Sequence, residues 1–183
     1  MLEAAFHDLH GSRLHGFALL VTLGDARRAE AAAGEALAAG GQQALALRHP
    51  ERAAAWLRAR VLRATRHRPP SHAAGDARRR SALEALGVDA AVYECLAALS
   101  NTARAALVAS AIEGFETIDV ETILGTGPER TQHLIAEARA GYLSTAGYTR
   151  DGATSMSAWA DGPLMARVRN VATRAMSAEA SSR

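Results

Sequence analysis

Apolar residues recur along this chain at intervals of three and four, the spacing that places them on one face of an α-helix. The pattern starts with a stripe formed by Phe6, Leu9, Leu14, Phe17, Ala18 and Val21. No segment alternates apolar and polar residues as a half-buried strand does. Aromatic residues make up only 4% of the chain, so the core must consist mainly of alanine, leucine and valine in closely packed helices. The sequence therefore predicts an all-α fold.

Helix stop signals divide this pattern into separate helices. The first helix is expected to end at Leu23-Gly24-Asp25, the second to run from about Asp25 to Ala39 with Gly40-Gly41 as its stop, and the third from Pro50 to about His67. Trp56, Leu57 and Val61 are expected to point inward from the third helix. Further helices are predicted over 91–99, 102–112, 118–124 and 128–143.

Two changes in composition mark the boundaries between parts of the chain. Arg68-Pro69-Pro70 opens a stretch of small polar residues, which predicts a linker over 69–81 between helical domains at 1–68 and 82–143. Residues 144–183 form a C-terminal extension rich in serine, threonine, glycine and alanine. Within it, residues 161–176 are predicted to form an amphipathic helix that docks on one of the domains, with its apolar face formed by Leu164, Met165, Val168 and Val171.

Charge is distributed unevenly between these parts. The whole chain carries a formal net charge of +2, but residues 1–80 hold thirteen arginines against seven acidic residues, a net of +6. Residues 81–143 hold three arginines against nine acidic residues, a net of −6, and the rest carries +2. This pattern favours attraction within the chain, or two partners of opposite sign, over a single polyanion surface.

Missing residue types exclude several kinds of chemistry. The chain contains no lysine, which excludes phosphate-loop nucleotide binding and Schiff-base catalysis. Its single cysteine, Cys95, excludes an intramolecular disulfide and a thiolate zinc site, and is expected to be a small buried residue. His7, His10 and His15 have no supporting set of metal ligands, so packing is the preferred interpretation. We expect no enzyme activity, no catalytic residue, no metal and no cofactor, and we place the chain in the cytoplasm, without a membrane association.

One local pattern is typical of a helix-turn-helix. Glu113-Gly114-Phe115 is followed by a short apolar-periodic segment that ends at Gly125, and a further helix starts three residues later at Pro128. Glycine tolerates the left-handed conformation that reverses the chain at such a turn. An ordinary helical hairpin fits the same pattern equally well.

The order of motifs resembles the extracytoplasmic-function sigma factors of the sigma-70 family. Residues matching region 4 of that family are Leu99, Arg104, Leu107-Val108, Ile112-Glu113-Gly114-Phe115, Ile123-Leu124-Gly125 and Ala138-Arg139-Ala140. Residues matching region 2 are Arg13-Leu14, Phe17-Ala18, Gly24-Asp25, Ala29-Glu30, Glu35 and Trp56-Leu57. The resemblance covers about residues 5–143. It implies two small helical domains and a bacterial protein that joins core RNA polymerase, with its first domain at the −10 element and its second at the −35 element.

The resemblance also implies site residues. The basic third helix would contact the −10 strand through Arg58, Arg60, Arg63, Arg66 and Arg68. A solvated helix surface explains these arginines equally well. In the predicted recognition helix, Thr131, Ile135 and Ala138 are expected inward, and the residues expected to face DNA are Arg130, Gln132 and His133. Glu30, Glu35 and an outward Leu134 are expected to contact polymerase or another partner.

Departures from the family pattern leave a second interpretation open. Ala31, Ala32-Ala33 and Gly34 replace larger side chains that contact polymerase in the family, and Glu129 and Glu137 would face phosphate. DNA contact is therefore expected from the first domain more than from the second. The alternative is a sigma mimic, which keeps a surface recognised by an anti-sigma factor or another protein and does not read DNA.

Overall fold

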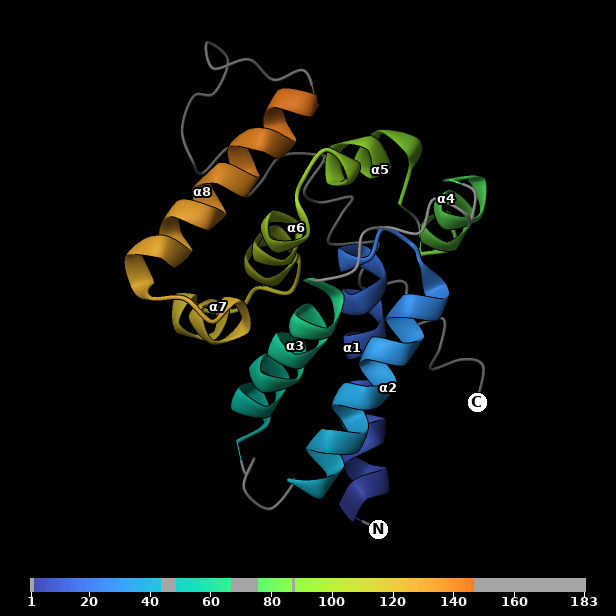
Figure 1. Ribbon diagram of the computed structural model, residues 1–183, viewed down its shortest axis with the longest axis vertical. Coiled ribbons are helices and arrows are strands. Elements are labelled where there is room, and N and C mark those ends of the chain that lie inside the picture. The colour runs from blue at the N-terminus through green and yellow to red at the C-terminus, as the bar shows by residue number, and fades with distance from the viewer. Residues whose placement is uncertain (1, 44–48, 67–75, 87, 147–183) are drawn as a thin grey trace.

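The computed structural model describes residues 2–43, 49–66, 76–86 and 88–146, and every regular element in these ranges is a helix (Figure 1). The elements are α1 (Leu2–Val21), α2 (Ala26–Gln42), α3 (Pro50–Arg66), α4 (Asp76–Glu84), α5 (Ala90–Ala97), α6 (Asn101–Leu107), the π-helical turn η1 (Val108–Ile112), α7 (Thr117–Leu124) and α8 (Pro128–Thr145). The all-α prediction is confirmed for these residues, which contain no strand.

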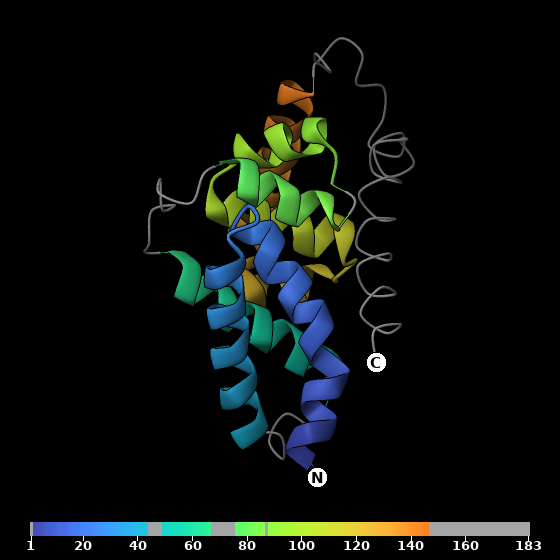
Figure 2. The ribbon, with the colours of Figure 1, turned by 90° about the vertical axis from the view of Figure 1, so that its right-hand side faces the viewer.

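The first three helices form one side of the molecule. Helices α1 and α2 run side by side as a long hairpin, which is clearest in Figure 2. Helix α3 packs against both of them. A tight turn joins α1 to α2, and the Asp25 carboxylate caps the second helix by accepting a hydrogen bond from the Arg28 backbone N–H at 3.1 Å.

The later helices pack onto the α1 and α3 side of this group. Helix α6 lies between α3 and α8, and α7 packs against both α3 and α8 (Figure 1). Asp89 caps α5 and Ser100 caps α6, each by accepting a hydrogen bond from a backbone N–H three residues on, at 2.9 and 3.2 Å. The capping explains why α5 and α6 begin one residue before the predicted starts.

A single cluster of buried apolar residues runs through the described residues of both predicted domains. From α1 and α3 its fully buried members include Leu14, Phe17, Leu57 and Val61. From the later helices they include Leu96, Leu107, Ile123 and Leu124. As predicted, alanine, leucine and valine form most of this core, so the helices approach one another closely.

Three details differ from the prediction. Helix α2 continues through Gly40-Gly41 to Gln42, because Gly40 is buried and packing outweighs the low helix propensity of glycine. Leu9, expected in the apolar stripe of α1, is 61% exposed, because His10, Leu14, Phe17 and Val21 form the buried stripe instead. Trp56, expected to point inward, is only partly buried.

Helix α4 starts at Asp76, inside the range predicted as a linker. Its Leu83 is fully buried, and its Arg79 guanidinium lies 3.8 Å from the Asp25 carboxylate. A short helix at this position is therefore held by contacts with the turn between α1 and α2. The predicted boundaries of the linker and domains stay predictions, since Arg68 and 69–75 lie outside the described residues, as do 147–183 with the predicted helix 161–176.

Candidate nucleic-acid and partner interface

Helices α7 and α8 are joined by a short turn at the glycine where the sequence predicts one. Helix α7 ends on Gly125, whose φ of 66° is left-handed, and its N–H donates to the Glu121 carbonyl oxygen at 2.8 Å. Three residues later Pro128 starts α8. The hydroxyl groups of Thr126 and Thr131 lie 2.8 Å apart and tie the turn to the first turn of α8.

The start of α8 presents polar side chains to solvent. Arg130, Gln132 and His133 are all exposed, as the sequence predicts. The His133 imidazole lies 3.8 Å from the Glu137 carboxylate one turn later. The exposed face therefore combines hydrogen-bond donors with acidic groups at Glu129 and Glu137.

The prediction of an outward Leu134 is wrong. Leu134 is 8% exposed and belongs to the core, whereas Ile135 is only partly buried. The buried stripe of α8 consists of Thr131, Leu134, Ala138 and Tyr142, at intervals of three and four. This spacing is visible in the sequence and was the signal that could have placed Leu134 inward. Leu134 therefore supports the position of α8 from within the core.

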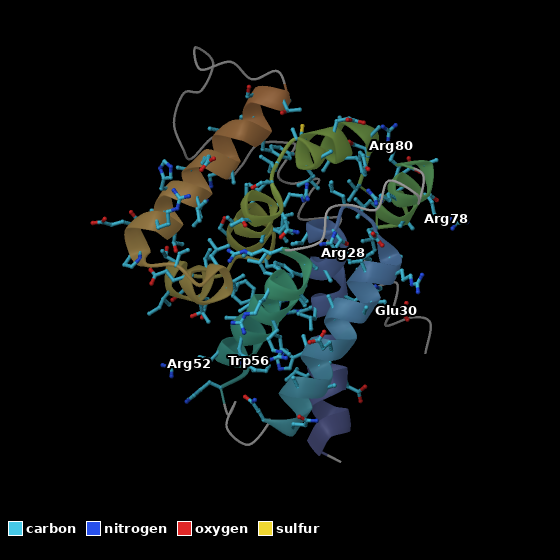
Figure 3. The ribbon with its side chains drawn as sticks, in the orientation of Figure 1. Arg28, Glu30, Arg52, Trp56, Arg78 and Arg80 are labelled. Carbon is cyan, nitrogen blue, oxygen red and sulfur yellow. The ribbon has the colours of Figure 1, made fainter. Side chains whose placement is uncertain are left out.

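Helix α3 divides its arginines between interior and surface. Arg63 and Arg66 are exposed, and Arg60 is partly exposed and stacks on Trp56 with its guanidinium carbon 5.1 Å from the ring centre. Arg52 extends from the start of α3 away from the rest of the molecule (Figure 3). Arg58 was expected with the exposed group, and the structure contradicts that expectation, since its side chain is only 3% exposed.

Arg58 is buried because it pairs with Glu113 of the later segment. Its Nε donates to Glu113 Oε2 at 2.6 Å, its Nη2 donates to Oε1, and Nη1 donates to the Ala54 carbonyl oxygen at 3.0 Å. Its guanidinium carbon lies 4.9 Å from the Phe115 ring centre and 5.6 Å from that of Phe17. This is a two-point carboxylate contact lined by aromatic rings.

The pairing of Arg58 was not anticipated from the sequence. Arg58 directly follows the buried Leu57 and precedes the buried Val61 by three residues. It therefore shares the helical phase of the core, and a partner of opposite charge was to be expected for it. The sequence does not indicate which carboxylate fills that role, because Glu113 is 55 residues away.

Three other arginines donate to carbonyl oxygens at the ends of neighbouring helices. Arg28 of α2 donates to Thr65 near the end of α3, and Arg66 donates to Leu124 at the end of α7 at 3.1 Å. Arg104 donates to Val21 at the end of α1 at 3.1 Å. Positive groups are favourable at helix C-termini, where the last carbonyl oxygens have no partner within the helix. Arginine therefore has a structural role here that composition alone does not reveal.

The two acidic residues predicted as partner contacts lie on the exposed side of α2. Glu30 and Glu35 are both exposed, and the Glu35 carboxylate lies 3.9 Å from the Arg60 guanidinium. Glu30 is labelled on the outer side of α2 in Figure 3. Exposed pairs at this distance contribute little to stability, which leaves both carboxylates accessible to a partner.

The remaining titratable residues that the structure describes do not form a metal site. In the described ranges no group of three or more histidine, cysteine, aspartate or glutamate side chains could hold a metal ion. His10 is buried and His15 partly buried, and the side chain of His7 lies outside the described residues. Cys95 is buried, as predicted, and burial raises the pKa of its thiol. No helix of the described residues has both the length and the apolar content needed to cross a membrane.

Comparison of the chain with protein-family models, with curated proteins and with solved structures finds no significant match.

Proposed function

We propose that this protein is a sigma-factor-like transcription regulator that acts in the cytoplasm, associating with core RNA polymerase and promoter DNA to direct initiation. The main support for the proposal is the arrangement of α7, the turn at Gly125 and α8. It combines a left-handed glycine turn with three exposed donor side chains, Arg130, Gln132 and His133, at the start of the second helix. Residues at that place on a recognition helix are the ones that reach base edges in the major groove.

The side chains on α8 suit base recognition chemically. The planar guanidinium of Arg130 can donate two hydrogen bonds to a guanine, and the amide of Gln132 can pair with an adenine. The buried stripe that contains Thr131 and Leu134 keeps α8 fixed beneath them. The resemblance to region 4 assigns this surface to the −35 element.

The exposed arginines of α3 support contact with a single strand. Arg63 and Arg66 both reach solvent, and Arg60, three residues before Arg63, is partly exposed over the ring of Trp56. A positive helix face with a nearby aromatic ring is the combination that single strands favour, because phosphates meet cations and bases stack. The resemblance to region 2 assigns this face to the −10 element.

A second candidate function is a sigma mimic that binds a protein and does not read DNA. The burial of Arg58 favours it, because an arginine expected on the DNA-contacting face is instead paired with Glu113. Glu129 and Glu137 favour it too, since both are exposed on the face of α8 that would meet phosphate. In this case Glu30 and Glu35 on α2 would contact an anti-sigma factor or another protein partner.

Two measurements made together separate these functions. In the first, the tagged full chain is mixed with core RNA polymerase and captured by its tag, and the polymerase recovered with it is measured. In the second, the same mixture is used for run-off transcription from a library of promoter fragments. A sigma-like regulator is retained on polymerase and yields a promoter-dependent transcript. A mimic yields neither, but is recovered with a protein partner.

A pair of variants tests the assigned surface within the same assay. Gln132→Ala removes an exposed amide from α8 and is expected to lower transcription from the selected promoter at least tenfold. Gln42→Ala removes the same group from the exposed end of α2, which lies away from α8 (Figure 1), and serves as the matched control. Equal activity of both variants contradicts the assignment of α8 as the recognition helix.

A further inference from the structure

The outer face of α7 presents a large apolar side chain to solvent. Val120, Ile123 and Leu124 form the buried side of α7, and Ile118 lies on the opposite side of the helix with 66% of its surface exposed. Thr122, one turn later, is also exposed, and its hydroxyl donates to the Ile118 carbonyl oxygen at 3.2 Å. Figure 1 shows α7 at the edge of the molecule. Its outer face is therefore accessible to a further element.

Carboxylates flank Ile118 on both sides. At about 100° per residue, Asp119 lies to one side of the line through Ile118 and Thr122, and Glu121 lies to the other. Both are partly exposed, and Glu116, directly before α7, is exposed. Ile118, Thr122 and these carboxylates together are called the α7 face. The α7 face is apolar at its centre and negative at its edges.

Residues 161–176 of the C-terminal extension have the complementary sequence pattern. Their spacing predicts one apolar helical stripe, with Leu164 and Val168 among its members. On the same helical projection, Arg167 falls to one side of this stripe and Arg169 to the other. The predicted stripe is therefore apolar at its centre and positive at its edges, opposite in charge to the α7 face.

Charge distinguishes the α7 face from the surroundings of another exposed apolar residue. Among the residues that the structure describes, the exposed large apolar side chains are Ile118 and Leu9, and Leu9 is 61% exposed on α1. Leu9 lies between Asp8 and, one turn later, Arg13, and both of these charged residues are exposed. Charges of both signs thus surround Leu9, whereas those around Ile118 on α7 are negative. A stripe flanked by arginines is attracted more strongly to the α7 face.

The chain that precedes the predicted stripe is long enough to reach the α7 face. The seventeen residues 147–163 separate Ala146 from Leu164 and span up to about 55 Å when extended. The 18 residues of α8 span about 27 Å, and the start of α8 follows α7 after a short turn. The extension can therefore return along α8 as far as α7.

We propose that the α7 face is the docking surface for residues 161–176 of the same chain. Leu164 and Val168 cover Ile118, and Arg167 and Arg169 pair with the carboxylates at the edges of the α7 face. An isolated helix of about 15 residues is marginal in water and depends on packing for its stability, so this segment gains its helix by docking. The inference stands on the fold and the sequence, and it does not depend on nucleic-acid binding.

Amide hydrogen exchange of the full chain tests the docking. Ile118→Ser removes the apolar centre of the α7 face, and Leu9→Ser makes the same kind of change on α1 and is the matched control. In the unmodified chain and in Leu9→Ser, exchange in 161–176 is expected to be at least tenfold slower than in an unfolded chain of the same sequence. In Ile118→Ser it is expected to be at least fivefold faster than in the unmodified chain, because the docked state is lost.

Charge reversal tests whether the arginines contact the α7 face. Glu121→Arg is expected to raise exchange in 161–176 at least threefold, and Glu84→Arg, at an exposed position of α4, is the control that leaves it unchanged. Glu121→Arg is then combined in turn with Arg167→Glu and with Arg169→Glu. One of these combinations is expected to restore exchange to within twofold of the unmodified chain, because opposite charges then meet again. Failure of both combinations overturns the pairing.

A further variant covers the case in which Ile118→Ser does not fold. Thr122→Arg places a large cation at the centre of the α7 face and is expected to have the same effect. Rapid exchange throughout 161–176 in the unmodified chain overturns the proposal, and so does protection that survives in a folded variant at Ile118 or Thr122. Protection that develops only as the protein concentration rises, with the mass of a dimer in light scattering, assigns the α7 face to a second copy and also overturns it.

Discussion

The guanidinium of Arg104 donates from Nε to the carbonyl oxygen of Val21, 83 residues earlier, at 3.1 Å. Its Nη1 also donates to the carbonyl oxygens of Leu96 and Leu99 at 3.0 and 2.7 Å. One side chain on α6 therefore satisfies backbone acceptors at the ends of α1 and α5. Burial lowers the pKa of Arg104 to about 10, which still leaves it charged at neutral pH.

Replacing Arg104 is expected to destabilise the whole described core. Arg104→Met keeps most of the volume but leaves three buried carbonyl oxygens without this donor, and roughly 3 kcal/mol of unfolding free energy should be lost. Urea denaturation followed by circular dichroism measures the change. Arg63→Met removes an exposed arginine from α3 and is expected to change stability by less than about 0.5 kcal/mol. Similar losses in both variants contradict the structural role of Arg104.

Gly24 is predicted to tolerate no side chain. Its φ is +74°, and an added Cβ would lie 2.2 Å from the Arg79 carbonyl oxygen of α4. Gly125 has a similar φ of +66° but open space around the position of a Cβ. Gly125→Ala should therefore cost only the conformational term, about 1–2 kcal/mol, and Gly24→Ala roughly 3 kcal/mol, because the clash adds to it. Equal costs in thermal unfolding contradict the close contact between α4 and the α1–α2 turn.

His10 is expected to make the fold sensitive to acid. Burial, with smaller contributions from the positive charges of Arg58 and Arg13, lowers the pKa of His10 below its ordinary value of 6.5. The unfolded chain then takes up a proton near pH 6.5, where the folded chain does not, so the unfolding free energy falls as the pH drops below about 6.5. The loss between pH 7 and pH 5 should be smaller in His10→Gln, whereas the exposed His133→Gln should follow the unmodified chain. Parallel pH profiles for all three proteins contradict this assignment.

Arg63 is expected to contribute to single-strand binding through phosphate. Replacing it with glutamine should weaken binding of an oligothymidine strand and reduce the slope of log affinity against log salt by about 0.7, the value for one lost contact. Fluorescence titrations at several salt concentrations measure both quantities. Arg27→Gln removes an equal charge from the exposed start of α2 and is the control. A salt slope that falls equally in the two variants indicates general attraction and not a contact on α3.

Most helices of the described residues, and most of their ends, were predictable because the signals are local; α4, in the range predicted as a linker, was missed. Gly24 and Gly125 adopt the left-handed conformation that ends a helix, and Pro128 starts one. The failure at Gly40 has a tertiary cause, since neighbouring helices bury this residue. The failure at Leu134 does not, since its spacing from Thr131 and Ala138 is a local signal that places it inward.

The candidate site was predictable only where it is local. Arg130, Gln132 and His133 are exposed as expected, because they follow a recognisable turn. Arg58 was wrongly assigned to the surface, because it can be buried only with Glu113 as its partner. Nothing in the sequence indicates that pairing, because the two residues lie 55 positions apart. The +6 and −6 segments favoured attraction within the chain or two partners of opposite sign, and they did not indicate which side chains pair. The Arg58–Glu113 contact follows from the packing of α3 against the residues around η1 and α7.

The central claim, that this chain directs initiation as a sigma-like regulator, is tested most directly by run-off transcription with purified core RNA polymerase and the full chain. The account predicts a transcript that requires the chain, depends on promoter sequence, and falls at least tenfold when Gln132→Ala replaces the unmodified protein. Failure to recover the chain with core polymerase, together with transcript levels equal to those of polymerase alone, would contradict it.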